Sequence, residues 1–297
     1  MTPKVSVVIP AYNAERFLGA TLASLRGQTF RDFETVVVDD GSADGTGRIA
    51  GEFLEVRLLR QANAGVAAAR NAGVRETRSE WVAFLDADDL WMPGKLEEQL
   101  EAAANSDAGA VFCDLQIIGV LGEEIPQPPP VTVSLEMEAL LLHEESIPQA
   151  TSSTVLVRRS VLEAVGGYDE NLATMADWDL LLRLRRETSF AHVPRKLAAY
   201  RRYPGSMSRS VPMLERESRI VLDKAFGRPD LPEALRRLEA RSRAWNDLVL
   251  CGSNFQAGGI PRALGFGLRA ITRNPRLIGR ILETPVRRMR RLLAAPQ

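Results

Sequence analysis

Residues 5–13 read VSVVIPAYN, a β-branched run that passes into proline and polar residues. Such a run predicts a short buried strand over Val5–Pro10. Asn13 then precedes Ala14–Gln28, where apolar residues recur at helical spacing, so Asn13 is expected to cap a helix. The chain therefore opens with a strand followed directly by a helix.

The alternation of strand and helix continues to about residue 115. Alternating elements of this kind predict a mostly parallel central sheet with helices on both faces. Further strands are expected at Glu34–Asp40, Val56–Leu59, Trp81–Leu85 and Ala108–Cys113, with helices at Ala64–Glu76 and Lys95–Ala104.

Polar residues stand at three of the predicted strand ends, namely Pro10–Asn13, Asp39–Asp40 and Asp86–Asp89. In open sheets with parallel strands, ligands bind beyond the carboxyl ends of the strands. We therefore expect these polar groups to converge on one binding site.

The second half of the chain has a mixed pattern and then becomes helical. The expected fold is α/β, with a mostly parallel mixed central sheet flanked by helices and a helical C-terminal extension. Strands are expected at Ser152–Val157 and Ala198–Arg201, helices at Ser160–Val165 and Asp177–Arg186, and a helical pattern from Pro212 onward.

Charge and cysteine content narrow the class of protein. The 297 residues carry 38 Lys and Arg and 38 Asp and Glu, a balance that argues against a general nucleic-acid binder. Cys113 and Cys251 have neither a disulfide framework nor a metal-ligand spacing, so a reducing, cytoplasmic compartment is expected. We see no signal peptide at the N-terminus and no apolar run near the ~18 residues of a membrane span.

The sequence DADD at Asp86–Asp89 places three carboxylates directly after a predicted strand. Two unit charges about 4 Å apart repel by about 4 kcal/mol at an effective dielectric near 20, so a cation would stabilise the cluster. Mg²⁺ characteristically uses one or two carboxylates together with substrate phosphates. The cluster predicts a metal and diphosphate site, and the alternative is a cap for the helix that starts near Pro93.

Two further groups have a functional and a structural interpretation. A carboxylate of Asp39–Asp40 can accept a hydrogen bond from a base or a ribose hydroxyl, or it can close a turn. Arg70 lies in the small-residue helix NAGVAAARNAG at residues 63–73. Its planar guanidinium can pair with a phosphate, or it can lie on the surface of a packing helix.

Four sequence motifs, taken together, are characteristic enough to indicate a protein family. VSVVIPAYN, VVVDDGSADGT, NAGVAAARNAG and WVAFLDADD follow one another in this order. Over about residues 4–205 the chain resembles the family-two group of inverting glycosyltransferases, which have an A-type nucleotide-sugar-binding fold. The resemblance implies that the nucleotide-sugar lies against Pro10, Ala11, Tyr12, Asn13, Asp39, Asp40, Arg70, Asp86 and Ala87, and that Asp88 binds Mn²⁺ or Mg²⁺.

The second half adds another match. GGYDE at residues 166–170 is followed by MADWDL at residues 175–180. The family usually has Glu-Asp before the aromatic residue, and the Asp acts as general base. Here Ala176 stands at the Glu position, while Asp177 keeps the position of the base. The alternative for Asp177 is a helix N-cap.

The segment Tyr200–Ser208 resembles the family's flexible segment after the last core strand. The resemblance implies that Arg201 or Arg202 folds over the diphosphate when the donor binds, as closing loops often do. A solvated basic loop is the alternative.

The resemblance implies an enzyme that moves a sugar from a nucleotide-sugar, UDP-linked by expectation, to a glycan or lipid-linked saccharide in polysaccharide biosynthesis of the cell envelope. Residues 1–210 would be the catalytic domain, with a nucleotide-sugar half at 1–115 and an acceptor half at 116–210, and residues 211–297 a helical extension. A sugar nucleotidyltransferase is disfavoured, because PAYNAERF at residues 10–17 replaces the glycine-rich loop of those enzymes. A nucleotide-sugar-binding protein that has lost catalysis is the other alternative.

The chain ends in a basic segment. Residues 262–297 contain nine arginines and one glutamate, a net charge of +8. A basic amphipathic helix of this kind often lies on an anionic membrane surface, here the inner face of the cell membrane. The alternative is a helix that packs its apolar stripe on the catalytic domain and leaves its arginines in solvent. On a helix, one face would carry Arg262, Arg269, Arg273, Arg276 and Arg280.

Overall fold

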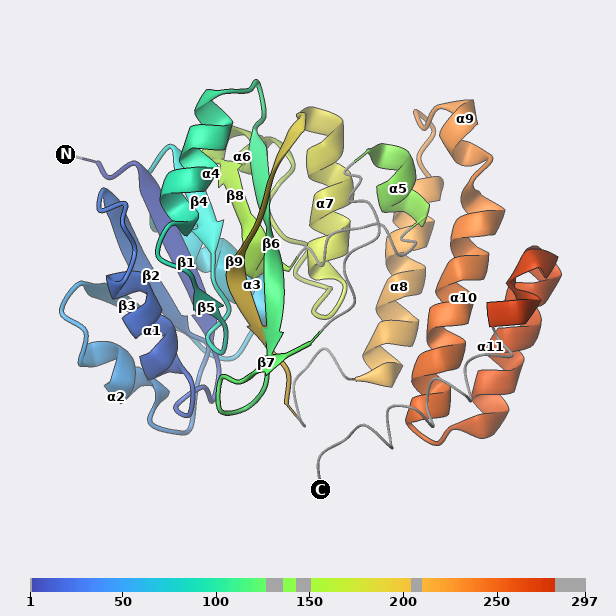
Figure 1. The fold of residues 1–297 in the computed structure, drawn as a ribbon, viewed down its shortest axis with the longest axis horizontal. Helices are drawn as coiled ribbons and strands as arrows, with labels where there is room; N and C mark the ends of the chain where they lie inside the picture. The colour runs from blue at the N-terminus through green and yellow to red at the C-terminus, as the bar shows by residue number, and fades with distance from the viewer. Residues whose placement is uncertain (1, 127–135, 143–150, 204–209, 281–297) are drawn as a thin grey trace.

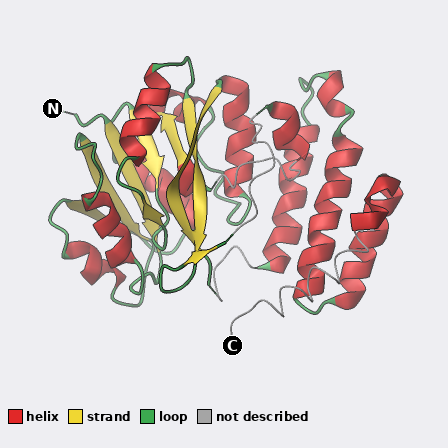
Figure 2. Ribbon diagram, viewed as in Figure 1, coloured by secondary structure: helices red, strands yellow, loops and turns green. Residues whose placement is uncertain are grey.

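The computed structural model describes residues 2–126, 136–142, 151–203 and 210–280. A central sheet with helices on both faces occupies one part of the molecule, and a layer of helices from the C-terminal part of the chain lies beside it (Figures 1 and 2). The expected α/β fold with a helical C-terminal region is confirmed.

The sheet has its parallel part on one side and a mixed part on the other. The strand order is β3-β2-β1-β4-β8-β6-β9-β5, and β7 pairs with β6. Strands β1, β2, β3 and β4 are all parallel to one another. Strand β8 lies between β4 and β6 and is antiparallel to both. The strands are β1 (Val5–Ala11), β2 (Phe33–Asp39), β3 (Val56–Arg60), β4 (Trp81–Phe84), β5 (Leu90–Trp91), β6 (Ala110–Ile118), β7 (Glu124–Ile125), β8 (Val155–Arg158) and β9 (Phe190–Arg201).

The helices complete the two faces and the extension. Helix α7 lies between the sheet and α8 in Figure 1. The helices are α1 (Leu18–Arg26), α2 (Thr46–Gly51), α3 (Val66–Arg75), α4 (Lys95–Ala104), α5 (Met137–Leu142), α6 (Arg159–Ala164), α7 (Ala176–Glu187), α8 (Val211–Phe226), α9 (Glu233–Arg236), α10 (Glu239–Gln256) and α11 (Ile260–Arg273), with the 3₁₀ turns η1 (Ser152–Thr154) and η3 (Pro275–Leu277).

Alternate residues of each central strand enter two different cores, because successive side chains point to opposite faces. In β1, Val7 joins the core formed with α1, α2 and α4, whereas Val8 joins the core formed with α7 and α8. Strand β4 divides in the same way. Both faces are buried, which explains why these strands appear in the sequence as continuous apolar runs.

Three expectations about local structure are wrong. Asn13 does not cap a helix: α1 begins at Leu18 with Phe17 at its N-cap, and Asn13 has a φ of 48°. Its side-chain oxygen instead accepts a hydrogen bond from the backbone N–H of Ala43, as asparagine often does in turns. Asp177 does not cap α7, whose N-cap is Met175.

The third error concerns two strands of the second half. The segment expected as a strand from Ser152 begins with the turn η1, and only the residues from Val155 pair with the sheet. Strand β9 starts at Phe190 rather than Ala198, because it pairs along the whole of β6. Pairing with a distant strand is a tertiary effect that local pattern does not contain.

The C-terminal helices pack in an unexpected way. Small side chains of α11, including Ala263 and Ala270, are buried, whereas the larger Leu264 and Leu268 are 70% and 65% exposed. The expectation that the arginines remain in solvent is only partly met, since Arg273 donates a hydrogen bond to Asp247 of α10. Residues 281–297 of the predicted basic tail lie outside the described residues. Among the described residues, every helix is too short or too polar to cross a membrane.

Candidate functional site

The carboxyl ends of β1, β2 and β4 lie at one edge of the sheet. The register pairs Ala11 with Asp39, so the loops that start with Tyr12 and Asp40 leave the sheet side by side. Strand β4 is parallel to β1 and leads into Asp86 at the same edge. The expected convergence of the three strand ends is therefore present. Pro10 and Ala11 are buried in the strand, while Tyr12 is 54% exposed.

Arg70 of α3 connects the two halves of the site. Its Nη2 lies 2.7 Å from Oδ1 of Asp86, and its Nη1 lies 3.2 Å from Oδ1 of Asp177. The side chain is only 4% exposed, and its guanidinium lies 4.8 Å from the centre of the Tyr168 ring. A buried guanidinium needs charged partners, and here it takes one from each half of the chain.

Asp177 is a carboxylate held from several sides. Its Oδ2 accepts a hydrogen bond from the backbone N–H of Ser152 at 3.0 Å, and its Oδ1 accepts one from the Ser152 hydroxyl at 2.5 Å. Burial raises the pKa of Asp177, the charge of Arg70 lowers it, and the charge of Asp86 raises it again. The balance leaves the pKa of Asp177 above its ordinary value, which makes this carboxylate a stronger proton acceptor than a free aspartate.

Asp88 lies in an environment that is unfavourable for a lone anion. Burial and the negative charge of Asp86 raise the pKa of Asp88 to about 6, and a hydrogen bond with Tyr203 partly opposes this. A cation would offset both effects, so the position fits a metal that is completed by substrate phosphates. Within the described ranges, no group of three or more His, Cys, Asp or Glu side chains forms a complete metal site.

Asp89, the last carboxylate of the cluster, is structural. It is completely buried, and its Oδ1 accepts a hydrogen bond from the backbone N–H of Arg201 at 2.9 Å. Its Oδ2 accepts one from the Ser153 hydroxyl at 2.6 Å. Neither Asp88 nor Asp89 caps the following helix, because the N-cap of α4 is Gly94.

The carboxylates after β2 hold loops together. Oδ1 of Asp40 accepts hydrogen bonds from Gln61 Nε2 and the backbone N–H of Ala64, and its Oδ2 accepts one from the backbone N–H of Gly65. These bonds fix the entry to α3 and thereby the position of Arg70. Contact of Asp40 with a base remains a prediction.

Asp39 also stabilises the loop that follows β2. Its Oδ1 accepts a hydrogen bond from the backbone N–H of Ser42 at 3.0 Å, and its Oδ2 lies 3.9 Å from Arg60. The side chain is 8% exposed. Its predicted contact with the nucleotide likewise remains a prediction.

Arg201 is buried at the end of β9 rather than placed on a loop. Its guanidinium donates to the backbone oxygens of Asp88, Gly119 and Val120 at 2.8–3.0 Å, and it is 4% exposed. This side chain supports the loop that carries Asp88. Arg202 is exposed. Residues 204–209 of the segment expected to close over the donor lie outside the described residues.

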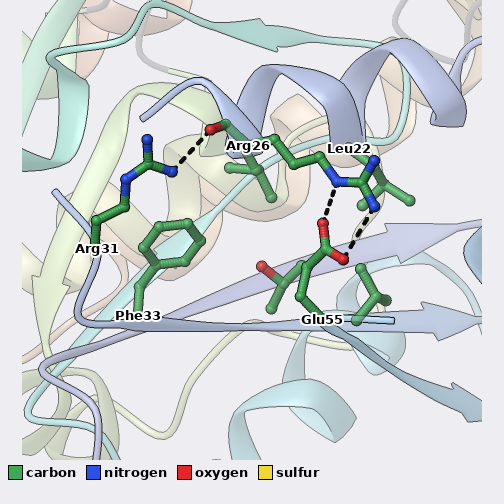
Figure 3. Close-up of a pocket in the computed structure, with 8 residues that line it drawn as sticks. Leu22, Arg26, Arg31, Phe33 and Glu55 are labelled. Atoms are coloured by element: carbon green, nitrogen blue, oxygen red, sulfur yellow. Dashed lines mark hydrogen bonds and ion pairs between the residues drawn. The ribbon is translucent and has the colours of Figure 1, made fainter. Parts of the chain in front are cut away.

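A separate hollow of about 290 Å³ lies at the amino ends of the strands, away from the carboxyl ends that carry the carboxylate cluster (Figure 3). It is lined by Phe33 and Val56, the first residues of β2 and β3, and by Leu22 of α1. Arg26 and Glu55 form an ion pair at its rim. Because it adjoins the amino ends of the strands, this hollow is not part of the carboxylate cluster.

Ser152, Ser153 and Tyr168 were not expected in the site from their residue type. For the two serines, the signal in the sequence is the run Thr151–Thr154, four consecutive hydroxyl residues in a segment otherwise expected to be a buried strand. Buried hydroxyls need hydrogen-bond partners, so such a run indicates a polar contact inside the fold.

The chain is similar to known glycosyltransferases in sequence. A family model described as Glycosyl transferase family 2 matches residues 6–166, more than half of the chain. The chain is 34% identical over 117 residues to the UDP-Glc:alpha-D-GlcNAc-diphosphoundecaprenol beta-1,3-glucosyltransferase WfgD of Escherichia coli, a match over 38% of this chain and 46% of WfgD. Matches to two other curated relatives span 34% and 37% of their lengths, about a third.

Two solved structures have the same fold. TarS 1–349 of S. aureus in complex with UDP-GlcNAc has a TM-score of 0.64 at 22% identity, over 95% of this chain and 81% of that chain. The mannosyltransferase PcManGT from Pyrobaculum calidifontis, in complex with GDP-Man and Mn²⁺, has a TM-score of 0.62 at 20% identity, over 92% and 76%. At these identities the likeness concerns the fold alone. The two matches cover 95% and 92% of this chain and therefore include the C-terminal helices.

Replacing Arg70 should destabilise the fold strongly. In Arg70→Ala, Asp86 and Asp177 lose the cation between them, and we expect the free energy of unfolding to fall by about 3 kcal/mol. Urea denaturation followed by circular dichroism measures this change. Arg57→Ala is the matched control, because its pair with Glu76 is exposed and contributes at most about 1 kcal/mol. Equal losses in the two variants would contradict a central role for the buried pair.

Proposed function

Since the chain belongs to glycosyl transferase family 2, we propose that it transfers a sugar from a UDP-sugar to a lipid-linked saccharide with inversion, using Asp177 as general base. The observation that carries this proposal is the position of Arg70, between Asp86 at the donor edge and Asp177 on the acceptor side. The names of WfgD and of the TarS complex support a UDP donor, and that of WfgD supports a lipid-linked acceptor.

The arrangement suits a single displacement. The acceptor hydroxyl oxygen forms a bond to the anomeric carbon while the bond from that carbon to the diphosphate oxygen breaks, and the hydroxyl proton passes to Asp177. One carboxylate within hydrogen-bond reach of the hydroxyl is enough for this step. Asp177 is 26% exposed, and among the described residues Oδ2 has a single protein donor, so one of its lone pairs is left for the acceptor proton.

Arg70 and Asp88 would stabilise the leaving diphosphate. Arg70 lies beside Asp86 with a planar guanidinium that matches phosphate oxygens. Asp88 would hold Mn²⁺ or Mg²⁺, and the Mn²⁺ named in the PcManGT complex supports this. When bound, such a metal neutralises developing charge on the diphosphate.

Asp177→Asn tests the general base. We expect kcat to fall by roughly 10²- to 10⁴-fold, because the amide cannot take the acceptor proton. Binding of UDP, measured by calorimetry, should be retained. In the wild-type enzyme the acid limb of kcat should lie above the usual aspartate pKa of about 3.9, since activity is lost as pH falls through the raised pKa of Asp177. A variant with wild-type turnover would exclude Asp177 as the base.

Asp88→Ala tests metal use. Turnover of a UDP-sugar in the presence of Mn²⁺ should fall by about 100-fold or more, and EDTA should produce a similar loss in the wild-type enzyme. Undiminished turnover in Asp88→Ala would refute metal binding by this residue. A wild-type protein that binds UDP but releases none from any UDP-sugar would instead be a binding protein without catalysis.

The extension would bring the enzyme to its lipid-linked acceptor. Ile260, Leu264 and Leu268 follow one another at one-turn spacing on α11, and all three are exposed. Together with the net charge of +8 in residues 262–297, this apolar stripe supports contact with an anionic membrane surface at the inner face of the cell membrane.

Vesicle flotation tests the membrane contact. The wild-type protein should float with anionic vesicles, and a Leu264→Gln/Leu268→Gln variant should bind at least about tenfold more weakly, because it no longer buries two leucines. Leu54→Gln is the matched control, since Leu54 is 97% exposed at a distant loop. Equal flotation of all three proteins, or of a protein that lacks residues 262–297, would rule the contact out.

A further inference from the structure

The turn η1 lies where the two halves of the site meet. Its three residues, Ser152, Ser153 and Thr154, are at most 1% exposed. A buried hydroxyl costs free energy unless it forms hydrogen bonds, so the partners of these side chains identify what the turn does. The two serine hydroxyls have partners in different parts of the site.

Ser152 serves the acceptor side. Its backbone N–H and its hydroxyl donate to the two oxygens of Asp177, at 3.0 and 2.5 Å. Its Oγ also lies 2.8 Å from the hydroxyl of Tyr168. The single proton of the Ser152 hydroxyl is donated to Asp177, so the phenol of Tyr168 is the donor in this contact. The result is a chain from Tyr168 through Ser152 to Asp177.

Ser153 serves the donor side. Its hydroxyl donates to Oδ2 of Asp89 at 2.6 Å and accepts from the backbone N–H of Asp86 at 3.1 Å. Its backbone oxygen accepts from Nε1 of Trp91 at 2.8 Å. These contacts hold the loop between β4 and β5, which carries Asp88, near its start at Asp86 and at its last residue Asp89, and they hold β5 at Trp91.

We propose that η1 is a positioning element for sugar transfer: Ser152 orients Asp177, and Ser153 orients the loop of Asp86 and Asp88. The inference rests on the proposed function above. Consecutive Cα atoms are about 3.8 Å apart across a rigid peptide. Asp177 and the loop of Asp86 and Asp88 are therefore held by neighbouring residues of one turn. Neither group can shift relative to the other without deforming that turn. Rates of displacement depend on such geometry, and a misplacement of about 1 Å can lower them by roughly 100-fold.

Each serine should affect a different part of the kinetics. In Ser152→Ala, kcat should fall by roughly 10- to 100-fold with little change in the KM of the donor. In Ser153→Ala, the KM of the UDP-sugar should rise while the acid limb of kcat stays in place. Ser152→Thr retains the hydroxyl and should recover most of the lost kcat.

The pH profile distinguishes positioning from simple packing. Among the described residues, the groups that face Asp177 are Arg70 of α3, Asp86 of the β4–β5 loop, and Tyr168 and Ser152. The Ser152 hydroxyl favours the charged carboxylate, so its loss raises the pKa of Asp177. The acid limb of kcat in Ser152→Ala should therefore move to higher pH, and in Ser152→Thr it should return.

The experiment compares these variants with Ser218→Ala. Ser218 of α8 is also 1% exposed, but its hydroxyl has no partner among the described residues, so it reports the effect of removing any buried serine hydroxyl. Purified full-length proteins are assayed for UDP release from a UDP-sugar with Mn²⁺ across pH, after circular dichroism has shown that each is folded. A Ser152→Ala enzyme with unchanged kcat and an unmoved acid limb, or one indistinguishable from Ser218→Ala, overturns the proposal.

A second measurement separates this inference from the proposed function. Carbon-13 NMR of labelled aspartate follows the titration of Asp177 without any substrate. A higher pKa of Asp177 in Ser152→Ala supports the role of Ser152, and an unchanged one overturns it, even in a protein that releases UDP from no UDP-sugar. That lack of turnover would contradict the proposed function instead.

Discussion

The site depends on one buried cation. The guanidinium of Arg70 is almost fully removed from water, and this burial is offset because Asp86 and Asp177 pair with its two terminal nitrogens. Asp86 follows a parallel strand of the first half, whereas Asp177 lies in the first turn of α7 in the second half. The ion pairs thus join two parts of the chain that lie about a hundred residues apart in sequence.

The surroundings of Arg70 are arranged so that this cation stays in one place. Asp40 fixes the start of α3 through the backbone N–H groups of Ala64 and Gly65. Later in the helix, Gly73 packs so closely on β1 that an added Cβ would lie 2.4 Å from Val8. A helix that is anchored at both ends carries its arginine to a defined point, and preorganised charge of this kind is effective in catalysis.

The sequence predicts the parallel part of the sheet closely, because β1, β2 and β4 contain apolar runs that are buried on both faces and bounded by polar residues. Helix α4 begins and ends where its apolar spacing indicates. The conformation of Asn13 and the length of β9 depend on contacts with segments that are distant in sequence. The local sequence pattern does not predict such contacts. The same holds within the site. Whether Asp40 faces a ligand or a loop could not be read from its position at a strand end, because both interpretations require the same residue there.

The helical extension takes part in this arrangement through Glu217 of α8. This carboxylate is completely buried, and its Oε2 accepts hydrogen bonds from the backbone N–H groups of Ala173 and Met175. Those two residues lead directly into α7, where Ala176 has no polar side chain and Asp177 follows. A negative charge near the start of a helix also stabilises the helix dipole. Although α8 lies beyond residue 210, it therefore helps to define the position of Asp177, and a substitution in the extension can displace this carboxylate from a distance.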